Sequence, residues 1–197
     1  MKQLLRTVFL AVIFCGPVSA DFSDDYAIWL WDIAENGGTI DLGGAPGSVS
    51  LTSSNDGGFA NTDLSFTAFE AVTITFDWDF TTVDPGIPDT NGAQWDPFGY
   101  LLNGSFTKLS NDAGADSQSG AAVSFAVEIG DTFGFRANTV DGIFGAATTT
   151  ITNFSAIGPA PAAVPLPPSV SLLGFALGGV LLLQRRRRSD GLPRARA

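Results

Sequence analysis

Aspartate is the residue type in this sequence that is best placed to do chemistry. Asp77 and Asp79 alternate along an apolar segment, so a strand would place their side chains on one face, about 6.8 Å apart. Asp84, Asp89 and Asp96 follow in a stretch rich in proline and glycine. Ca²⁺ takes roughly six to eight oxygen ligands, so this set is a candidate calcium site. The alternative is that these are solvated strand and turn carboxylates, because the EF-hand pattern D-x-D-x-D-G is absent.

Aromatic residues form a second candidate site, for a sugar. Trp95, Tyr100, and either Trp29 or Trp31 could stack on the apolar face of a sugar ring if they are exposed. Trp95 is the best candidate because it lies in a Pro/Gly/Asp loop, where binding residues are common. The alternative is that Trp95 closes one end of the hydrophobic core.

The sequence lacks the residues that most catalytic mechanisms need. It has no histidine, which excludes His-based triads, His-ligated zinc and imidazole bases. Its one cysteine, Cys15, lies in a segment that we expect to be removed. A glycosidase needs only two carboxylates, but so many acidic residues make any single pair uninformative. We therefore expect no enzymatic activity, no catalytic residue and no cofactor, with calcium as the only candidate ligand ion.

Charge is distributed unevenly along the chain. Residues 21–164 contain 19 Asp and Glu but only 2 Lys and Arg, a net charge of −17, although the whole chain carries −10. Such a segment repels nucleic acid, so we expect no nucleic-acid partner. Its charge keeps it soluble and attracts cations.

The elements that must position these residues are predicted to be strands. Residues 72–80 alternate strictly between apolar and polar side chains, which predicts a half-buried strand with Trp78 in the core. Residues 121–129 and 132–137 alternate in the same way around Gly130-Asp131, which predicts a hairpin.

Further strands complete the pattern. Asn103-Gly104 is a strong two-residue hairpin turn between residues 98–102 and 105–109. The remaining predicted strands are residues 26–31, 38–41, 48–53, 64–69 and 148–157. About ten short strands without a long helix indicate an all-β domain over residues 21–158, an antiparallel, jelly-roll-like β-sandwich.

The N-terminus has the pattern of a secretory signal peptide at residues 1–20. Lys2 and Arg6 form a basic start, and an apolar stretch follows that is too short to span a membrane. Small residues precede the expected cleavage site between Ala20 and Asp21, where signal peptidase is the partner. Phe14 stands before Cys15 where a lipoprotein signal needs a small residue, so lipidation is not expected.

The C-terminus has three consecutive parts. Residues 159–168 form a linker in which proline and alanine predominate, and proline makes it extended. Residues 169–184 are apolar and uncharged up to Gln184, a transmembrane helix shorter than most. The basic tail, residues 185–197, begins with four stop-transfer residues that stay in the cytoplasm: Arg185, Arg186, Arg187 and Arg188. One reading of this end is an ordinary single-span anchor.

These three parts in this order resemble the PEP-CTERM sorting signal. Its VPLPA-type variant matches Val164, Pro165, Leu166 and Pro167, with Pro168 in place of the alanine. Several segments of the globular part, among them residues 96–104 and 130–135, resemble the exported β-domains that carry such signals. The resemblance implies that an exosortase, a membrane protease, removes the tail near the proline motif. It also implies delivery to the cell surface or extracellular matrix.

The sequence therefore predicts an exported protein that begins as a membrane-anchored precursor and ends at the cell surface or in the matrix. We expect a non-enzymatic structural or adhesive role. The alternatives are a carbohydrate-binding module for extracellular polysaccharide, with or without calcium, and a glycan-active enzyme.

Overall fold

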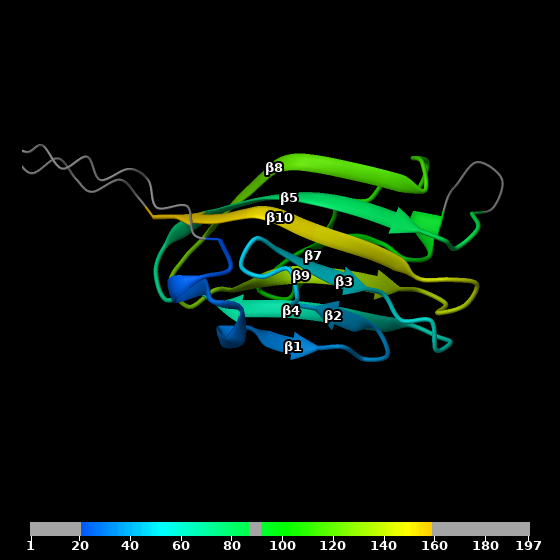
Figure 1. Ribbon diagram of the computed structural model, residues 1–197, viewed down its shortest axis with the longest axis horizontal. Coiled ribbons are helices and arrows are strands. Elements are labelled where there is room, and N and C mark those ends of the chain that lie inside the picture. The colour runs from blue at the N-terminus through cyan, green and yellow to red at the C-terminus, as the bar shows by residue number, and fades with distance from the viewer. Residues whose placement is uncertain (1–20, 87–91, 159–197) are drawn as a thin grey trace, which may run out of the picture. The chain divides into compact units, whose positions relative to one another are not determined.

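The computed structural model describes residues 21–86 and 92–158, which form two antiparallel sheets packed face to face (Figure 1). The first sheet has the strand order β1-β4-β9-β6-β7 and the second has the order β2-β3-β10-β5-β8. The strands are β1 (Asp32–Ala34), β2 (Thr39–Asp41), β3 (Ser48–Thr52), β4 (Ala60–Thr67), β5 (Val72–Thr82), β6 (Phe98–Leu102), β7 (Ser105–Lys108), β8 (Ser117–Val127), β9 (Thr132–Thr139) and β10 (Ala147–Ile157). Short 3-10 turns are η1 (Asp24–Tyr26), η2 (Ile28–Leu30) and η3 (Gly92–Gln94). The predicted all-β antiparallel sandwich is confirmed.

The strand order is that of a jelly roll. From β3 onward the chain changes sheet at almost every connection, and the strands stand in the orders β3-β10-β5-β8 and β4-β9-β6-β7. Because β5 runs antiparallel to β10, Thr82 at the end of β5 lies opposite Ala147 at the start of β10. The ends of β5 and β9 and the start of β6 therefore meet at one end of the sandwich, opposite the end where the described chain begins and ends (Figure 1).

Strand β5 forms where the alternation is clearest. It covers the predicted residues 72–80 and continues to Thr82, between β10 and β8. Its apolar side chains, Trp78 among them, are buried, and its polar side chains face outward. The period-two pattern is confirmed because only one face of this sheet meets the opposite sheet.

Aromatic rings fill the space between the sheets. Phe22 stacks on Phe154 with ring centroids 4.7 Å apart, and Trp31 stacks on Phe135 at 5.9 Å. Phe76 meets Phe135 edge to face at 4.9 Å. Each buried ring removes roughly 150–250 Å² from water, so these rings supply much of the stability of a domain that has no disulfide.

The strand predicted at residues 26–31 is wrong. The structure has the two turns η1 and η2 there, closed by a hydrogen bond from the Leu30 amide to the Ala27 carbonyl (2.9 Å). Tyr26 and Trp31 are both buried, and the Trp31 indole N–H donates to the Tyr26 carbonyl (3.0 Å). Residues five apart point to opposite faces of a strand, so burying both rings in one core requires the turns.

The hairpin predicted across Gly130-Asp131 is also wrong. Strand β8 is the edge of the second sheet beside β5, whereas β9 lies between β4 and β6 in the first sheet. The Gly130 amide donates to the Ala68 carbonyl (2.7 Å), and the Ala68 amide donates to the Asp131 carbonyl (2.8 Å). These bonds hold a connection that crosses from one sheet to the other. Phe133 and Phe135 are buried by this crossing, which a flat hairpin would not achieve.

The Asn103-Gly104 hairpin is confirmed. Leu102 lies opposite Ser105, and the two turn residues have φ angles of +50° and +79°, as a two-residue turn of this kind requires. Strands β2, β3, β4 and β10 correspond to predicted segments with shifted ends, whereas β1 was not predicted.

The terminal predictions lie outside the described residues. These are the signal peptide at 1–20 with Ala20, the linker at 159–168 with the sorting motif, the helix at 169–184, and the tail at 185–197 with its stop-transfer arginines. Asp21, on the other side of the expected cleavage site, is the first described residue. Within residues 21–86 and 92–158, no helix has the length and apolar character needed to cross a membrane.

Candidate functional site

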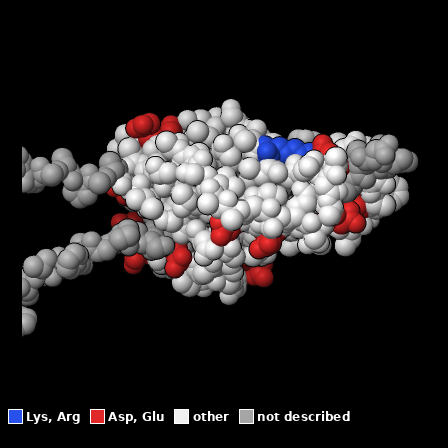
Figure 2. Space-filling model, turned by 90° about the horizontal axis from the view of Figure 1, so that it is seen from above, with Lys and Arg blue, Asp and Glu red and all other residues white. Residues whose placement is uncertain are grey.

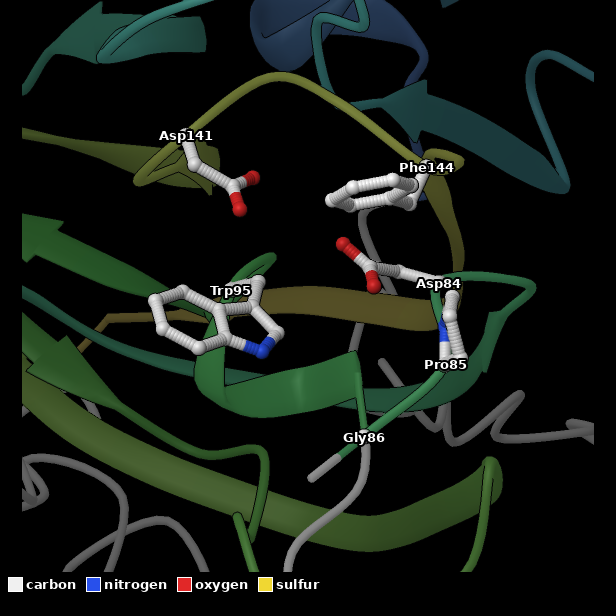
Figure 3. A pocket seen from close by; sticks show the side chains of 6 residues that line it. All are labelled: Asp84, Pro85, Gly86, Trp95, Asp141 and Phe144. Atoms are coloured by element: carbon white, nitrogen blue, oxygen red, sulfur yellow. The ribbon is translucent and has the colours of Figure 1, made fainter.

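A pocket of about 280 Å³ lies at the loop end of the sandwich, where β5 ends and β10 begins (Figure 3). Three segments that are distant in sequence build it: the stretch after β5, the turn η3 with the residue that follows it, and the loop between β9 and β10. Its walls are Asp84, Pro85, Gly86, Trp95, Asp141 and Phe144. Figure 3 shows both carboxylates pointing into the space between the two aromatic rings.

Trp95 is held by its backbone. Its amide donates to the Gly92 carbonyl (2.9 Å), and its carbonyl accepts from the Val140 amide (2.7 Å), which ties η3 to the end of β9. The side chain is partly exposed, and its ring packs against no other aromatic ring within the described part of the chain. Trp95 therefore lines an open pocket and is not a plug for the core.

Phe144 is presented to solvent by an unusual backbone conformation. Its φ angle is +71°, a region that bulky residues rarely adopt, and its side chain is 73% exposed. Glycines on each side allow this: a Cβ on Gly142 would lie 2.8 Å from the Gly58 carbonyl oxygen, and one on Gly145 would lie 2.9 Å from the Asp84 amide nitrogen. An exposed ring on a strained, closely packed loop is typical of a binding position.

Asp84 carries a buried and incompletely bonded carboxylate. The residue is 3% exposed, and its Oδ2 atom has no hydrogen-bond partner among the described residues. Its amide donates to the Thr82 hydroxyl (3.1 Å), which fixes the turn out of β5. Burial, and then repulsion from Asp141, raise the pKa of the Asp84 carboxyl above its usual value. The surroundings of Asp84 therefore disfavour the ionised form of its carboxyl group.

Asp96 lies beside the pocket and connects its segments. Its Oδ1 accepts a hydrogen bond from the Ser53 hydroxyl (2.8 Å), and that hydroxyl accepts from the Ala147 amide (2.9 Å). Burial raises the pKa of Asp96 to about 6, although hydrogen bonds from Ser53 and Thr139 oppose the shift. Asp96 thus has a structural role at the junction of β3, η3 and β10.

The predicted calcium residues do not come together as one site. Asp77 and Asp79 lie on the outer face of β5, and Asp77 accepts hydrogen bonds from the Ala122 amide (2.6 Å) and the Asn153 side chain (2.7 Å). These bonds lower the pKa of Asp77. Asp89 lies outside the described residues, and among those described no group of three or more acidic, His or Cys residues could hold a metal ion. Asp77 and Asp79 are neighbours on that outer face, whereas Asp84 and Asp96 interact electrostatically beside the pocket.

The predicted sugar-stacking residues separate in the same way. Trp95 lines the pocket, whereas Tyr100 stacks on Phe125 at 4.3 Å and packs against the core. Trp31 is buried in the core. Trp29 is 79% exposed, but it belongs to η2 at the opposite end of the sandwich (Figure 1).

Four pocket residues were not predicted from the sequence: Pro85, Gly86, Asp141 and Phe144. The signal that could have found two of them is the segment D-G-I-F-G at 141–145, an Asp-Gly turn and a phenylalanine between glycines. A large apolar residue in such a loop has no strand or helix to bury it.

Both basic residues of residues 21–158 are engaged in ion pairs. Arg136 on β9 donates two hydrogen bonds of 2.7 Å to Asp63 on β4, and Lys108 pairs with Asp112. On the face drawn in Figure 2, acidic side chains are scattered widely while basic atoms form one patch. The domain surface is therefore strongly acidic.

Comparisons with known proteins do not assign this chain to a family. No family model and no curated protein matches the chain. Among solved structures, the chain is similar to a GH26-CBM35 β-(1,4)-mannanase of Podospora anserina, with a TM-score of 0.35 and 16% identity. The match covers 74% of this chain and 29% of that chain. At this level the likeness does not indicate a function.

Proposed function

We propose that this chain is an exported, non-catalytic saccharide-binding protein that acts as an adhesive component of the cell surface or extracellular matrix. The pocket at the loop end carries the proposal. It combines two accessible aromatic rings, Trp95 and Phe144, with two carboxylates on a rigid β-scaffold. Aromatic rings stack on the C–H face of a sugar, and carboxylates accept hydrogen bonds from its hydroxyls.

The location of the pocket supports this role. Loops at one end of a β-sandwich are common binding sites because the strands hold them still. Here, a backbone hydrogen bond from Val140 to Trp95 joins two wall segments, and one from Gly57 to Gly142 (2.8 Å) ties the β9–β10 loop to the connection between β3 and β4. A preformed site loses little conformational entropy when a ligand binds.

Delivery to the surface is part of the same proposal. The signal peptide at 1–20 directs export and is cut by signal peptidase. The PEP-CTERM-type end from Val164 to Arg188 holds the precursor in the membrane until an exosortase-type protease acts. Mass spectrometry of the mature protein tests this directly: we expect termini at Asp21 and near Val164. A C-terminus that retains Arg188 would show a plain membrane anchor instead.

Binding is tested by titrating the full-length protein with a panel of oligosaccharides while following tryptophan fluorescence. We expect saturable changes in the native protein and a roughly tenfold weaker affinity for Trp95→Ala, since a ring contact contributes about 0.5–1.5 kcal/mol beyond its buried area. Trp29→Ala is the matched control, because Trp29 is exposed but at the other end. The proposal is contradicted if no oligosaccharide of the panel changes the fluorescence of the native protein, or if both variants lose affinity equally.

The same samples test the non-catalytic part of the proposal. Asp84 and Asp141 could in principle act as the acid and base of glycoside hydrolysis. We expect no new reducing ends after prolonged incubation with the bound oligosaccharide. Release of reducing ends that Asp84→Asn abolishes would establish an enzyme.

A further inference from the structure

The pocket holds more negative charge than the described protein neutralises. Asp84 is buried, its Oδ2 atom has no hydrogen-bond partner among the described residues, and Asp141 repels its charge. Leaving a charged carboxylate in such a place is costly unless a positive group reaches it. The pocket is therefore electrostatically incomplete as it stands.

Within the described part of the chain, every basic side chain is already paired with a carboxylate. Its basic residues are Lys108 and Arg136, and these pair with Asp112 and Asp63. Neither lines the pocket. Within residues 21–86 and 92–158, no side chain is left to place a positive charge beside Asp84, so a bound molecule is the candidate source.

The shape and chemistry of the walls favour an organic cation over a metal ion. Ca²⁺ needs roughly six to eight oxygen ligands, whereas the pocket offers two carboxylates between a tryptophan and a phenylalanine. An ammonium group is attracted to aromatic faces as well as to carboxylates. The volume of about 280 Å³ is slightly below the roughly 300–1,000 Å³ that is usual for ligand pockets, so the pocket suits a small ligand such as one sugar ring.

We infer that the pocket binds an amino sugar residue that carries a free ammonium group, with the ammonium between Asp84 and Asp141 and the ring against Trp95. This inference rests on the proposed saccharide-binding function and specifies its ligand class. The carboxylates supply the selectivity: an N-acetylated residue has no positive charge and leaves Asp84 unneutralised.

The test compares three oligosaccharides of equal length with the full-length protein by calorimetry: glucosamine oligomers, their N-acetylated counterparts, and neutral glucose oligomers. At a pH that keeps the amines protonated, we expect the glucosamine form to bind at least about tenfold more tightly, as expected for a charged hydrogen bond. Asp84→Asn and Asp141→Asn should each remove most of this preference. Asp141 is partly exposed, so its variant decides the matter if Asp84→Asn fails to fold.

The control separates the pocket from the general acidity of the domain. Asp79→Asn removes one exposed carboxylate from the outer face of β5, at a residue that does not line the pocket, and should leave the preference unchanged. Equal binding of the three sugars by the native protein overturns the amino sugar inference but leaves the proposed function standing. If the native protein binds none of the three oligosaccharides, both the amino sugar inference and the proposed saccharide-binding function are refuted. Ca²⁺ binding that Asp84→Asn abolishes would overturn the inference in favour of a metal site.

Discussion

Replacing Asp96 by asparagine should remove a pH dependence from the stability of the domain. Asp96 is 1% exposed, and burial raises its pKa from 3.8 to about 6 in the folded state. Between these values the folded protein holds a proton that the unfolded chain has lost. The contribution of Asp96 to stability is therefore largest below about pH 4, falls as the pH rises toward 6, and then levels off. The shift corresponds to a fall of about 3 kcal/mol in the free energy of unfolding across this pH range.

Asparagine has the same shape but cannot ionise. Its side-chain oxygen can still accept the hydrogen bond from Ser53, whereas its NH₂ group replaces an Oδ2 atom that has no hydrogen-bond partner among the described residues. An unsatisfied buried donor costs about 1–3 kcal/mol at every pH. We therefore expect a less stable variant at low pH, and a much smaller difference, or a reversal, at neutral pH.

The measurement is urea unfolding of the full-length protein and the variant at several values from about pH 4 to pH 7. Asp84, whose pKa is also raised, is present in both proteins, so the difference between their profiles reports Asp96 together with its electrostatic interaction with Asp84. Asp77 and Asp131 have lowered pKa values, so they change the stability of the domain only below this pH range. Asp79→Asn, which removes an exposed charge, should keep the native profile. Parallel profiles for the native protein and Asp96→Asn would refute the reasoning.

Two further perturbations test how the fold holds the site. Arg136→Met should destabilise the domain by about 1–3 kcal/mol, because it leaves the half-buried Asp63 without its two hydrogen bonds. A double-mutant cycle with Asp63→Asn in urea should give a coupling energy, and simple additivity would contradict the prediction. Gly92→Ala places a Cβ against the Asp84 carbonyl oxygen and the Thr82 hydroxyl, which should displace η3, lower Tm and weaken saccharide binding through Trp95. Native Tm and native affinity in this variant would show that the close approach is not needed.

Local patterns were sufficient to find most strands. The alternation in residues 72–80 led to β5, and Asn103-Gly104 led to the β6–β7 hairpin. Each of these signals needs only neighbouring residues: a strand places alternate side chains on opposite faces, and a two-residue turn needs positive φ. Where local and global demands differ, as at residues 26–31, burial of Tyr26 and Trp31 decided the backbone conformation.

The sequence by itself determined the all-β class, the acidic charge of the domain, and which faces of its main strands are apolar. Only the tertiary structure decided that β8 and β9 belong to different sheets, and that Asp84, Trp95, Asp141 and Phe144 share one pocket. The physical reason is that the alternation of apolar and polar residues determines which face of a strand is buried, but it does not determine which other strand it pairs with. Pairing depends on packing between distant segments, and in this fold it brings three separate loops to one end of the sandwich.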